Sequence, residues 1–153
     1  MKKNSKDTHL EAFKEYSVPA FGYEMFREVL VPEILGHEYQ SMLYWAGKKL
    51  ARKFPIETVE GISDFFLSAG FGTLTLIHKN RNEMEFELEG ELIALRLQEM
   101  KEPCFQLEAG FIAQQLEQMN EQVTESYEQV KKRGNKIVFT VKWDHKDIVL
   151  SNR

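Results

Sequence analysis

The strongest constraint on the fold is a strict alternation of apolar and charged residues over positions 83–89. Met84, Phe86 and Leu88 stand between four glutamates, so apolar and negatively charged side chains take turns. Because successive side chains of a β-strand point to opposite faces, this pattern predicts a strand with one buried and one solvent-facing side. Large apolar residues also stand at every second position over residues 137–143, where they alternate with Val138, Thr140 and Lys142, and this pattern predicts a second strand.

Turn signals connect these two strands to neighbours as antiparallel hairpins. Residues 73–77 are β-prone and are followed by a polar turn ahead of the strand at 83–89. Residues 123–130 form a weaker strand pattern, and Arg133-Gly134-Asn135 is a turn signal before the last strand. Residues 92–97 are predicted as a further strand. An antiparallel sheet of four or five strands is therefore expected.

Four segments carry apolar residues three and four positions apart, as one face of an α-helix requires. They cover residues 23–35, 37–54, 58–70 and 103–119, and Pro32 is expected to bend or split the first. Hairpins of strands combined with about four helices predict the α+β class.

The length of 153 residues is that of one ordinary domain. Residues 1–18 are polar with weak periodicity and are predicted to be a flexible tail, which docks loosely through Phe13 and Tyr16. Residues 19–150 are predicted to form the single domain, since no linker, repeat or low-complexity block interrupts them.

Composition excludes several classes of function. The net charge of −4 argues against bulk binding of nucleic acid. No apolar run approaches the roughly 20 residues of a membrane helix, and the start of the chain has no secretory signal. A cytoplasmic location is therefore expected. Cys104 is the single cysteine, which excludes an intramolecular disulfide and a CxxC metal site.

No catalytic or metal-binding constellation stands out. The string Gly70-Phe71-Gly72 follows a helix and precedes a strand, the reverse of a nucleotide-binding loop. The four histidines are too far apart in sequence for a helical ligand pair, and His78 is placed by alternation on the same side as Leu74 and Leu76. The glutamates of residues 83–89 share one strand face, where repulsion favours solvent or basic partners. We therefore expect a non-catalytic protein without metal or cofactor.

Four strings resemble the YslB-like family of uncharacterised bacterial proteins. They are EMFREVLVPEILG, YWAGKKLARKFP, FFLSAGFGTLTL and FQLEAGFIAQQLEQMN, and the resemblance spans residues 21–143. The family is in turn distantly similar to the 4-vinyl reductase domain and the TRAPP Golgi-transport subunits, which share a ligand-binding fold with the haem nitric-oxide sensors. The resemblance implies that fold and an apolar cavity. It implies neither haem nor zinc, because the chain has one cysteine and no histidine that matches the haem ligand.

Two function classes follow. The first is a binding module for a small apolar ligand or acyl chain. The alternative is a structural or adaptor protein that acts through a homodimer or partner interface. A homodimer through the early helices is expected because Phe26, Tyr44 and Trp45 exceed a single core-facing stripe, and because TRAPP subunits, which the chain distantly resembles, pair through their helices.

If a ligand cavity exists, we expect it between the helix at 104–119 and the sheet, with Phe71, Cys104 and Phe111 at its wall. The small residues of this helix allow a neighbour to approach closely, while its phenylalanines hold the neighbour off nearby. Cys104 is expected near a helix start, where the dipole favours a thiolate suited to acylation or redox sensing. Of the two interpretations of Cys104, the buried, inert thiol is favoured over the reactive thiolate.

Overall fold

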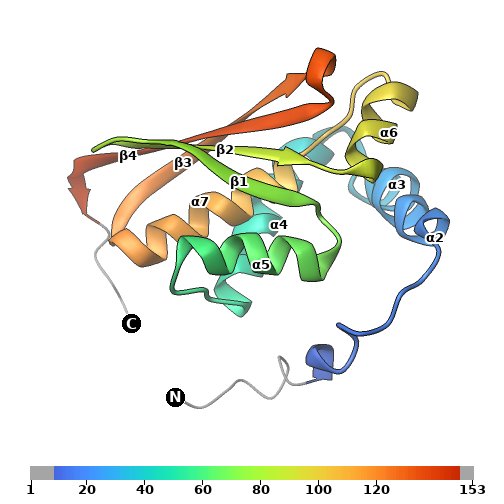
Figure 1. The fold of residues 1–153 in the computed structure, drawn as a ribbon, viewed down its shortest axis with the longest axis horizontal. Helices are drawn as coiled ribbons and strands as arrows, with labels where there is room; N and C mark the ends of the chain where they lie inside the picture. Colours follow the sequence, from blue (N-terminus) through green and yellow to red (C-terminus); the bar gives the residue numbers. More distant parts are fainter. Residues whose placement is uncertain (1–8, 149–153) are drawn as a thin grey trace.

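The computed structural model describes residues 9–148, with side chains described to residue 144, as a four-stranded antiparallel sheet with helices on one face (Figure 1). The strands, in the spatial order β1-β2-β4-β3, are β1 (Thr73–Lys79), β2 (Glu83–Glu89), β4 (Lys136–Ile148) and β3 (Gln122–Lys131). β1 and β2 form one hairpin, β3 and β4 form another, and β2 pairs with β4. The predicted α+β class and antiparallel sheet are confirmed.

From residue 20 to residue 148 the structure has five helices, if the broken first one is counted as a unit. Its parts are α2 (Ala20–Glu24), a π-helical stretch (Met25–Leu30) and α3 (Val31–Leu35), here called the N-terminal helical segment. A 3₁₀ turn (Gly36–Glu38) then leads to α4 (Tyr39–Lys53). The others are α5 (Val59–Ala69), α6 (Glu91–Glu99) and α7 (Gln106–Asn120).

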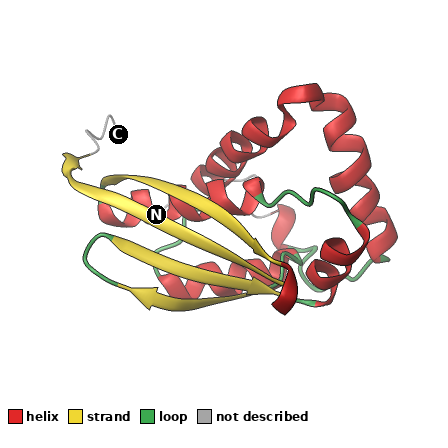
Figure 2. Ribbon diagram, turned by 90° about the horizontal axis from the view of Figure 1, so that it is seen from above, coloured by secondary structure: helices red, strands yellow, loops and turns green. Residues whose placement is uncertain are grey.

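The helices are unevenly distributed around the sheet. α4, α5 and α7 lie beneath it, whereas α2, α3 and α6 gather at one end (Figure 1). The view from above shows helices extending past that end of the strands (Figure 2). The opposite face of the sheet carries the glutamates of β2. Lys136 Nζ lies 2.5 Å from Glu87 Oε1, and Lys142 Nζ lies 3.7 Å from Glu83 Oε1, so the predicted basic partners are present.

α7 is the central helix, and residues 108–116 are all buried. On one side it packs against the sheet, and on the other its backbone meets that of α4. A Cβ atom on Gly110 would overlap the carbonyl oxygen of Tyr44, and one on Gly47 would overlap that of Leu107. The close helix approach expected from the small residues of α7 is therefore present, and α4 is the neighbour.

Large aromatic rings fill the interior, as expected from the eleven phenylalanines. Phe65 stacks on Phe111 with ring centroids 4.7 Å apart, and Phe66 meets Phe71 edge-on at 5.3 Å. Phe86 of β2 is also fully buried. The same holds for four phenylalanine or isoleucine side chains of the sheet and α7: Phe139, Ile137, Ile112 and Phe111. Offset and edge-on ring pairs of this kind add to the free energy of burial.

Residues 92–97 are helical, so their prediction as a strand was wrong. Ile93, Arg96 and Leu97 are the buried residues of α6, spaced three and four apart, and the segment consists of good helix formers. A run of six residues is too short for periodicity alone to separate a buried helix from a strand. The predicted position of His78 was also wrong, because the register shifts between Leu76 and His78 and the histidine is exposed.

The N-terminal helical segment contains a π-helical stretch ahead of Pro32. Val31 N–H donates to Phe26 O, five residues back rather than four. Proline has no backbone N–H and its ring crowds the preceding turn, so a wider turn accommodates it without ending the helix. The expected bend at Pro32 thus takes the form of a local change in helix type. Residues 9–18, the described part of the predicted tail, are exposed, and Phe13 and Tyr16 with them.

Candidate functional site

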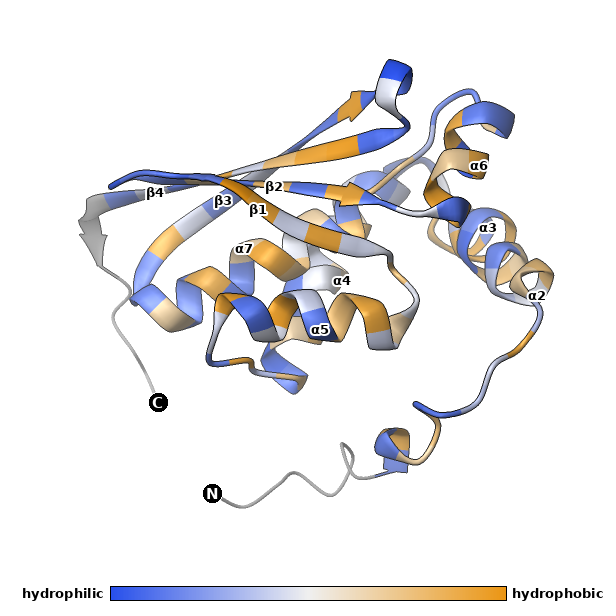
Figure 3. Cartoon of the chain, in the orientation of Figure 1, coloured by the Kyte–Doolittle hydropathy of each residue, from blue (hydrophilic) through white to orange (hydrophobic). Residues whose placement is uncertain are grey.

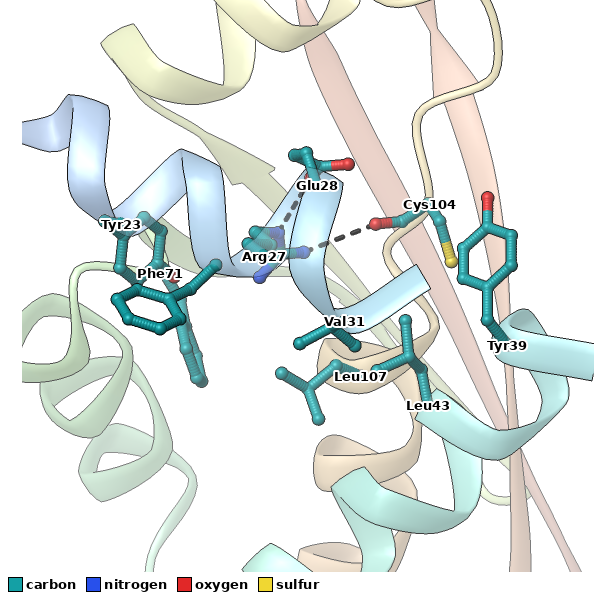
Figure 4. Close-up of a pocket in the computed structure, with 10 residues that line it drawn as sticks. Tyr23, Arg27, Glu28, Val31, Tyr39, Leu43, Phe71, Cys104 and Leu107 are labelled. Carbon is teal, nitrogen blue, oxygen red and sulfur yellow. Dashed lines mark hydrogen bonds and ion pairs between the residues drawn. The ribbon is translucent and has the colours of Figure 1, made fainter. Parts of the chain in front are cut away.

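A cavity of about 210 Å³ opens between the N-terminal helical segment, the start of α4 and the approach to α7 (Figure 4). Val31, Leu43 and Leu107 supply aliphatic wall from these three elements. Tyr23, Phe26, Tyr39 and Phe71 supply aromatic wall. Two charged residues, Arg27 and Glu28, and Cys104 complete the lining.

The chain builds this cavity from segments far apart in sequence. Phe71 lies in the turn after α5, where Gly70 adopts the left-handed conformation that ends the helix. Cys104 lies in the extended stretch between α6 and α7, two residues before α7 begins. The short 3₁₀ turn after α3 folds α4 back, which brings Tyr39 and Leu43 opposite Val31.

Arg27 forms the polar side of the cavity and is held by three acceptors. Its Nε donates to Glu28 Oε1 at 3.1 Å, and its Nη2 donates to the backbone oxygen of Cys104 at 3.3 Å. The same Nη2 lies 2.5 Å from Oε1 of Glu108. Burial by itself would lower the pKa of Arg27, but Glu108 and other neighbours outweigh it and the pKa is raised. The guanidinium is therefore permanently charged.

A second guanidinium, that of Arg96 in α6, continues the cluster. Arg96 Nε lies 2.9 Å from both carboxylate oxygens of Glu24, and its Nη2 lies 2.5 Å from Glu24 Oε1. Glu28 stands between the two arginines, with Arg96 Nε 3.9 Å from its Oε1. Burial raises the pKa of Glu28, while Arg27 and Arg96 oppose that shift. The N-terminal helical segment is thus fastened to the body by charged groups.

Glu108 is the most buried member of this cluster, with 1% of its side chain exposed. Both of its oxygens lack a hydrogen bond of good geometry within the described part of the chain, although Arg27 Nη2 is in close ionic contact. Leaving a carboxylate buried without a cation costs several kcal/mol, on the order of 3–5. Arg27 is therefore the counter-ion on which Glu108 depends.

Cys104 is a buried thiol with a protonated side chain at neutral pH. Burial raises the pKa of this thiol to about 11, although the Gln106 backbone, through a hydrogen bond, and Arg27, through its charge, oppose the shift. In Figure 4 its sulfur points toward Tyr39 and its carbonyl oxygen toward Arg27. These surroundings favour the inert thiol over the nucleophilic thiolate, because the thiolate is the reactive form.

Two of the three predicted wall residues, Phe71 and Cys104, line the cavity, and Phe111 does not. Phe111 is fully buried in the core, stacked on Phe65. The cavity also lies on the helical side, away from the strands, because α7 packs directly on the sheet and fills the space where a gap was expected. Arg27 and Glu28 were missed, since charged residues in an amphipathic helix are normally solvent-facing.

An outward-facing apolar surface covers the N-terminal helical segment. Four residues of this surface are between 64% and 77% exposed, and we call them the outer apolar face: Phe21, Phe26, Val29 and Ile34. Trp45 of α4 is also 58% exposed. Figure 3 shows apolar residues along α2 and α3 at the end of the molecule. Tyr44, by contrast, turns inward, where its hydroxyl accepts from Ser126 N–H at 3.1 Å.

Two negative findings concern the described residues only. Within residues 9–148 no helix is long and apolar enough to cross a membrane. Over the same part of the chain, no three histidine, cysteine, aspartate or glutamate side chains are grouped so that they could hold a metal ion.

Comparison with known proteins identifies relatives in sequence and in structure. A family model described as "Protein of unknown function (DUF2507)" matches residues 20–142. The uncharacterized protein YslB of Bacillus subtilis (strain 168) is 55% identical over 147 residues, which cover 96% of this chain and 99% of that protein. The similarity to the YslB-like family predicted from the four strings is confirmed.

Two solved structures are similar to this chain, to different degrees. A vinyl-4-reductase family protein from Methanocaldococcus jannaschii matches with a TM-score of 0.67 and 21% identity, covering 94% of this chain and 98% of that one. An Fe(II) unliganded H-NOX protein from K. algicida matches with a TM-score of 0.36 and 12% identity, over 74% of this chain and 57% of that one. The first likeness shows a common fold.

Proposed function

Since this chain belongs to the DUF2507 family of proteins of unknown function, we propose that it is a non-catalytic binding module for a small apolar ligand or acyl chain. The observation that carries the proposal is the cavity beside the N-terminal helical segment. Its walls are mostly aliphatic and aromatic, with polar groups confined to one region. Small-molecule sites in proteins typically have this composition.

The size of the cavity limits the ligand. A volume of about 210 Å³ is smaller than a drug-sized pocket, yet a cavity of roughly 150 Å³ accepts benzene. A group of about eight non-hydrogen atoms therefore fits, and a longer chain would extend through the open side. The proposal places the protein in the cytoplasm, where a lone cysteine stays reduced.

The experiment is native mass spectrometry of the purified protein, followed by extraction of any bound molecule. We expect an adduct that Val31→Phe abolishes, because the added ring occupies the cavity next to Leu43 and Leu107. Val29→Phe is the matched control, since Val29 lies on the same helical segment but is 66% exposed. An adduct retained equally by both variants would place the ligand elsewhere and refute the proposal.

The outer apolar face supports a second candidate, a structural or adaptor role through a homodimer. A helix that presents charged groups to the body and apolar groups to solvent is normally covered. Phe21, Val29, Ile34 and Trp45 each expose more than half of their surface, and a stable interface covers about 800 Å² per partner, so it would include their neighbours as well. A second copy offers the matching apolar surface.

A further inference from the structure

The polar side of the cavity has hydrogen-bonding capacity that the protein itself does not use. Arg27 employs Nε and Nη2 on Glu28, Cys104 and Glu108. Its other terminal nitrogen, Nη1, has no hydrogen-bond or ion-pair partner among the described residues. Because a guanidinium carries five N–H donors, two of them remain for a ligand. A hydrogen-bond acceptor is the group that these donors require.

The charge around Arg27 argues against an acceptor that is itself negative. Arg27 is in ionic contact with Glu28 and Glu108, and Arg96 is in ionic contact with Glu24. Glu128 lies nearby and accepts from Phe105 N–H at 2.8 Å. Four carboxylates thus surround two guanidiniums. A ligand carboxylate would add a further negative charge to a site where every positive charge is already paired.

Burial makes this discrimination effective. The side chains of Arg27 and Glu28 are 12% and 18% exposed, and that of Glu108 is 1% exposed. Charges in such surroundings are screened less by water and salt than surface charges are. Burial also raises the pKa of Glu28 and that of Glu128, because water is excluded from both carboxylates, while the charge of Arg27 opposes the shift.

We propose that the ligand carries an uncharged hydrogen-bond acceptor, such as an amide, ester or ketone carbonyl, which binds Arg27 Nη1, and that the pocket rejects the corresponding carboxylate. This inference rests on the proposed binding function and adds the chemistry of the ligand's polar end. The apolar remainder of the ligand contacts Val31, Leu43 and Leu107, and the carbonyl replaces water at the guanidinium.

The test compares three probes of about eight non-hydrogen atoms, matched to the cavity: hexanamide, hexanoate and ethylbenzene. Binding to the full-length protein is measured by calorimetry at pH 8, where hexanoate is ionised. We expect hexanamide to bind at least about tenfold more tightly than hexanoate, because each added charge pair within several ångströms changes affinity by that order. The affinity for ethylbenzene, a hydrocarbon, measures the contribution of the apolar walls of the cavity alone.

The outcomes separate this inference from the proposed function. If none of the three probes binds, the cavity is not a ligand site and the proposed function fails together with the inference. If ethylbenzene binds but hexanoate binds as tightly as hexanamide or more tightly, the function stands and the polar-end chemistry is overturned.

A charge-neutralising variant tests the cause of the preference. Glu28→Gln keeps an oxygen acceptor for Arg27 Nε but removes one negative charge, so the hexanamide preference should shrink about fivefold or more. Glu83→Gln is the control, because Glu83 lies on the outer face of the sheet. The Glu83→Gln protein should prefer hexanamide over hexanoate as strongly as the wild type does. An unchanged preference in a folded Glu28→Gln protein overturns the electrostatic cause. If Glu28→Gln does not fold, the comparison of hexanamide with hexanoate on the wild-type protein decides the proposal.

Discussion

At the scale of single residues, two opposing effects meet at Cys104, and their outcome depends on where a helix begins. A thiol in the first turn of a helix is stabilised as a thiolate by free N–H groups. α7 begins at Gln106, so Cys104 precedes that turn, and the residue is 6% exposed. Burial therefore dominates, and the thiol keeps its proton. Sequence could place a cysteine near a helix start, but the burial of the thiol, which only the fold determines, decides its chemistry.

Cys104 should make stability fall in alkaline solution. Its pKa rises from an ordinary 9.0 to about 11 on folding, so the unfolded chain loses the proton first. The contribution is fully present below pH 9 and is lost as pH rises through 11, by about 3 kcal/mol in total. Urea unfolding of the wild type and Cys104→Ser between pH 8 and 11 measures this difference. Parallel pH profiles for the two proteins would contradict the buried-thiol interpretation.

Arg96 should matter far more for stability than an exposed cation does. It is 3% exposed and holds Glu24 in a bidentate contact, so Arg96→Met leaves Glu24 and Glu28 without that charge. We expect a loss of about 3 kcal/mol in the free energy of unfolding. Lys136→Met, which breaks a partly exposed pair on the outer face of the sheet, should cost much less than Arg96→Met. Equal losses in chemical denaturation would show that the cluster does not fasten the helix.

At the scale of elements, periodicity predicts structure well where one face is buried and the segment is long. The strand at 83–89 and the helix at 39–53 follow from their patterns, because a shift of register would expose every apolar side chain. Residues 92–97 fail for the opposite reason: six residues give too few repeats to separate a helix from a strand. The π-helical stretch before Pro32 was not predictable, since the sequence indicates a break but not how the backbone absorbs it.

The crossing of α4 and α7 gives a prediction about elements. Gly110→Ala should destabilise the protein by about 3 kcal/mol or more, because the new Cβ overlaps backbone atoms of Tyr44 that cannot move aside as a side chain does. Gly22→Ala is the matched control in α2, where nothing lies within 4 Å, and helix propensity should raise stability by about 0.5–1 kcal/mol. Thermal unfolding measures both. A mild effect of Gly110→Ala would mean that the helices separate easily.

At the scale of the whole molecule, the layers were predictable and the candidate site was not. Alternation and turn signals indicate a sheet with helices on one side, and resemblance to a family indicates the same fold. The cavity is formed where residues around 27, 43, 71 and 107 meet. No local sequence pattern predicts that these four distant positions come together. The small residues of α7 were interpreted as indicating a gap, but they instead allow α4 to pack closely against α7. Phe71 and Cys104 line the cavity although the reasoning that predicted them, uneven spacing between this helix and the sheet, placed the gap elsewhere.

The outer apolar face gives the last prediction, which concerns assembly. If a second copy covers this face, a charge within it would have to be buried in the interface without a partner, which costs several kcal/mol. Ile34→Glu should therefore convert a dimer to a monomer in analytical ultracentrifugation at tens of micromolar protein. Leu67→Glu is the control, because Leu67 of α5 is 60% exposed, close to the 71% of Ile34, but lies outside the face. A wild-type protein that sediments as a monomer would contradict the homodimer directly, and dissociation by both variants would place the interface elsewhere.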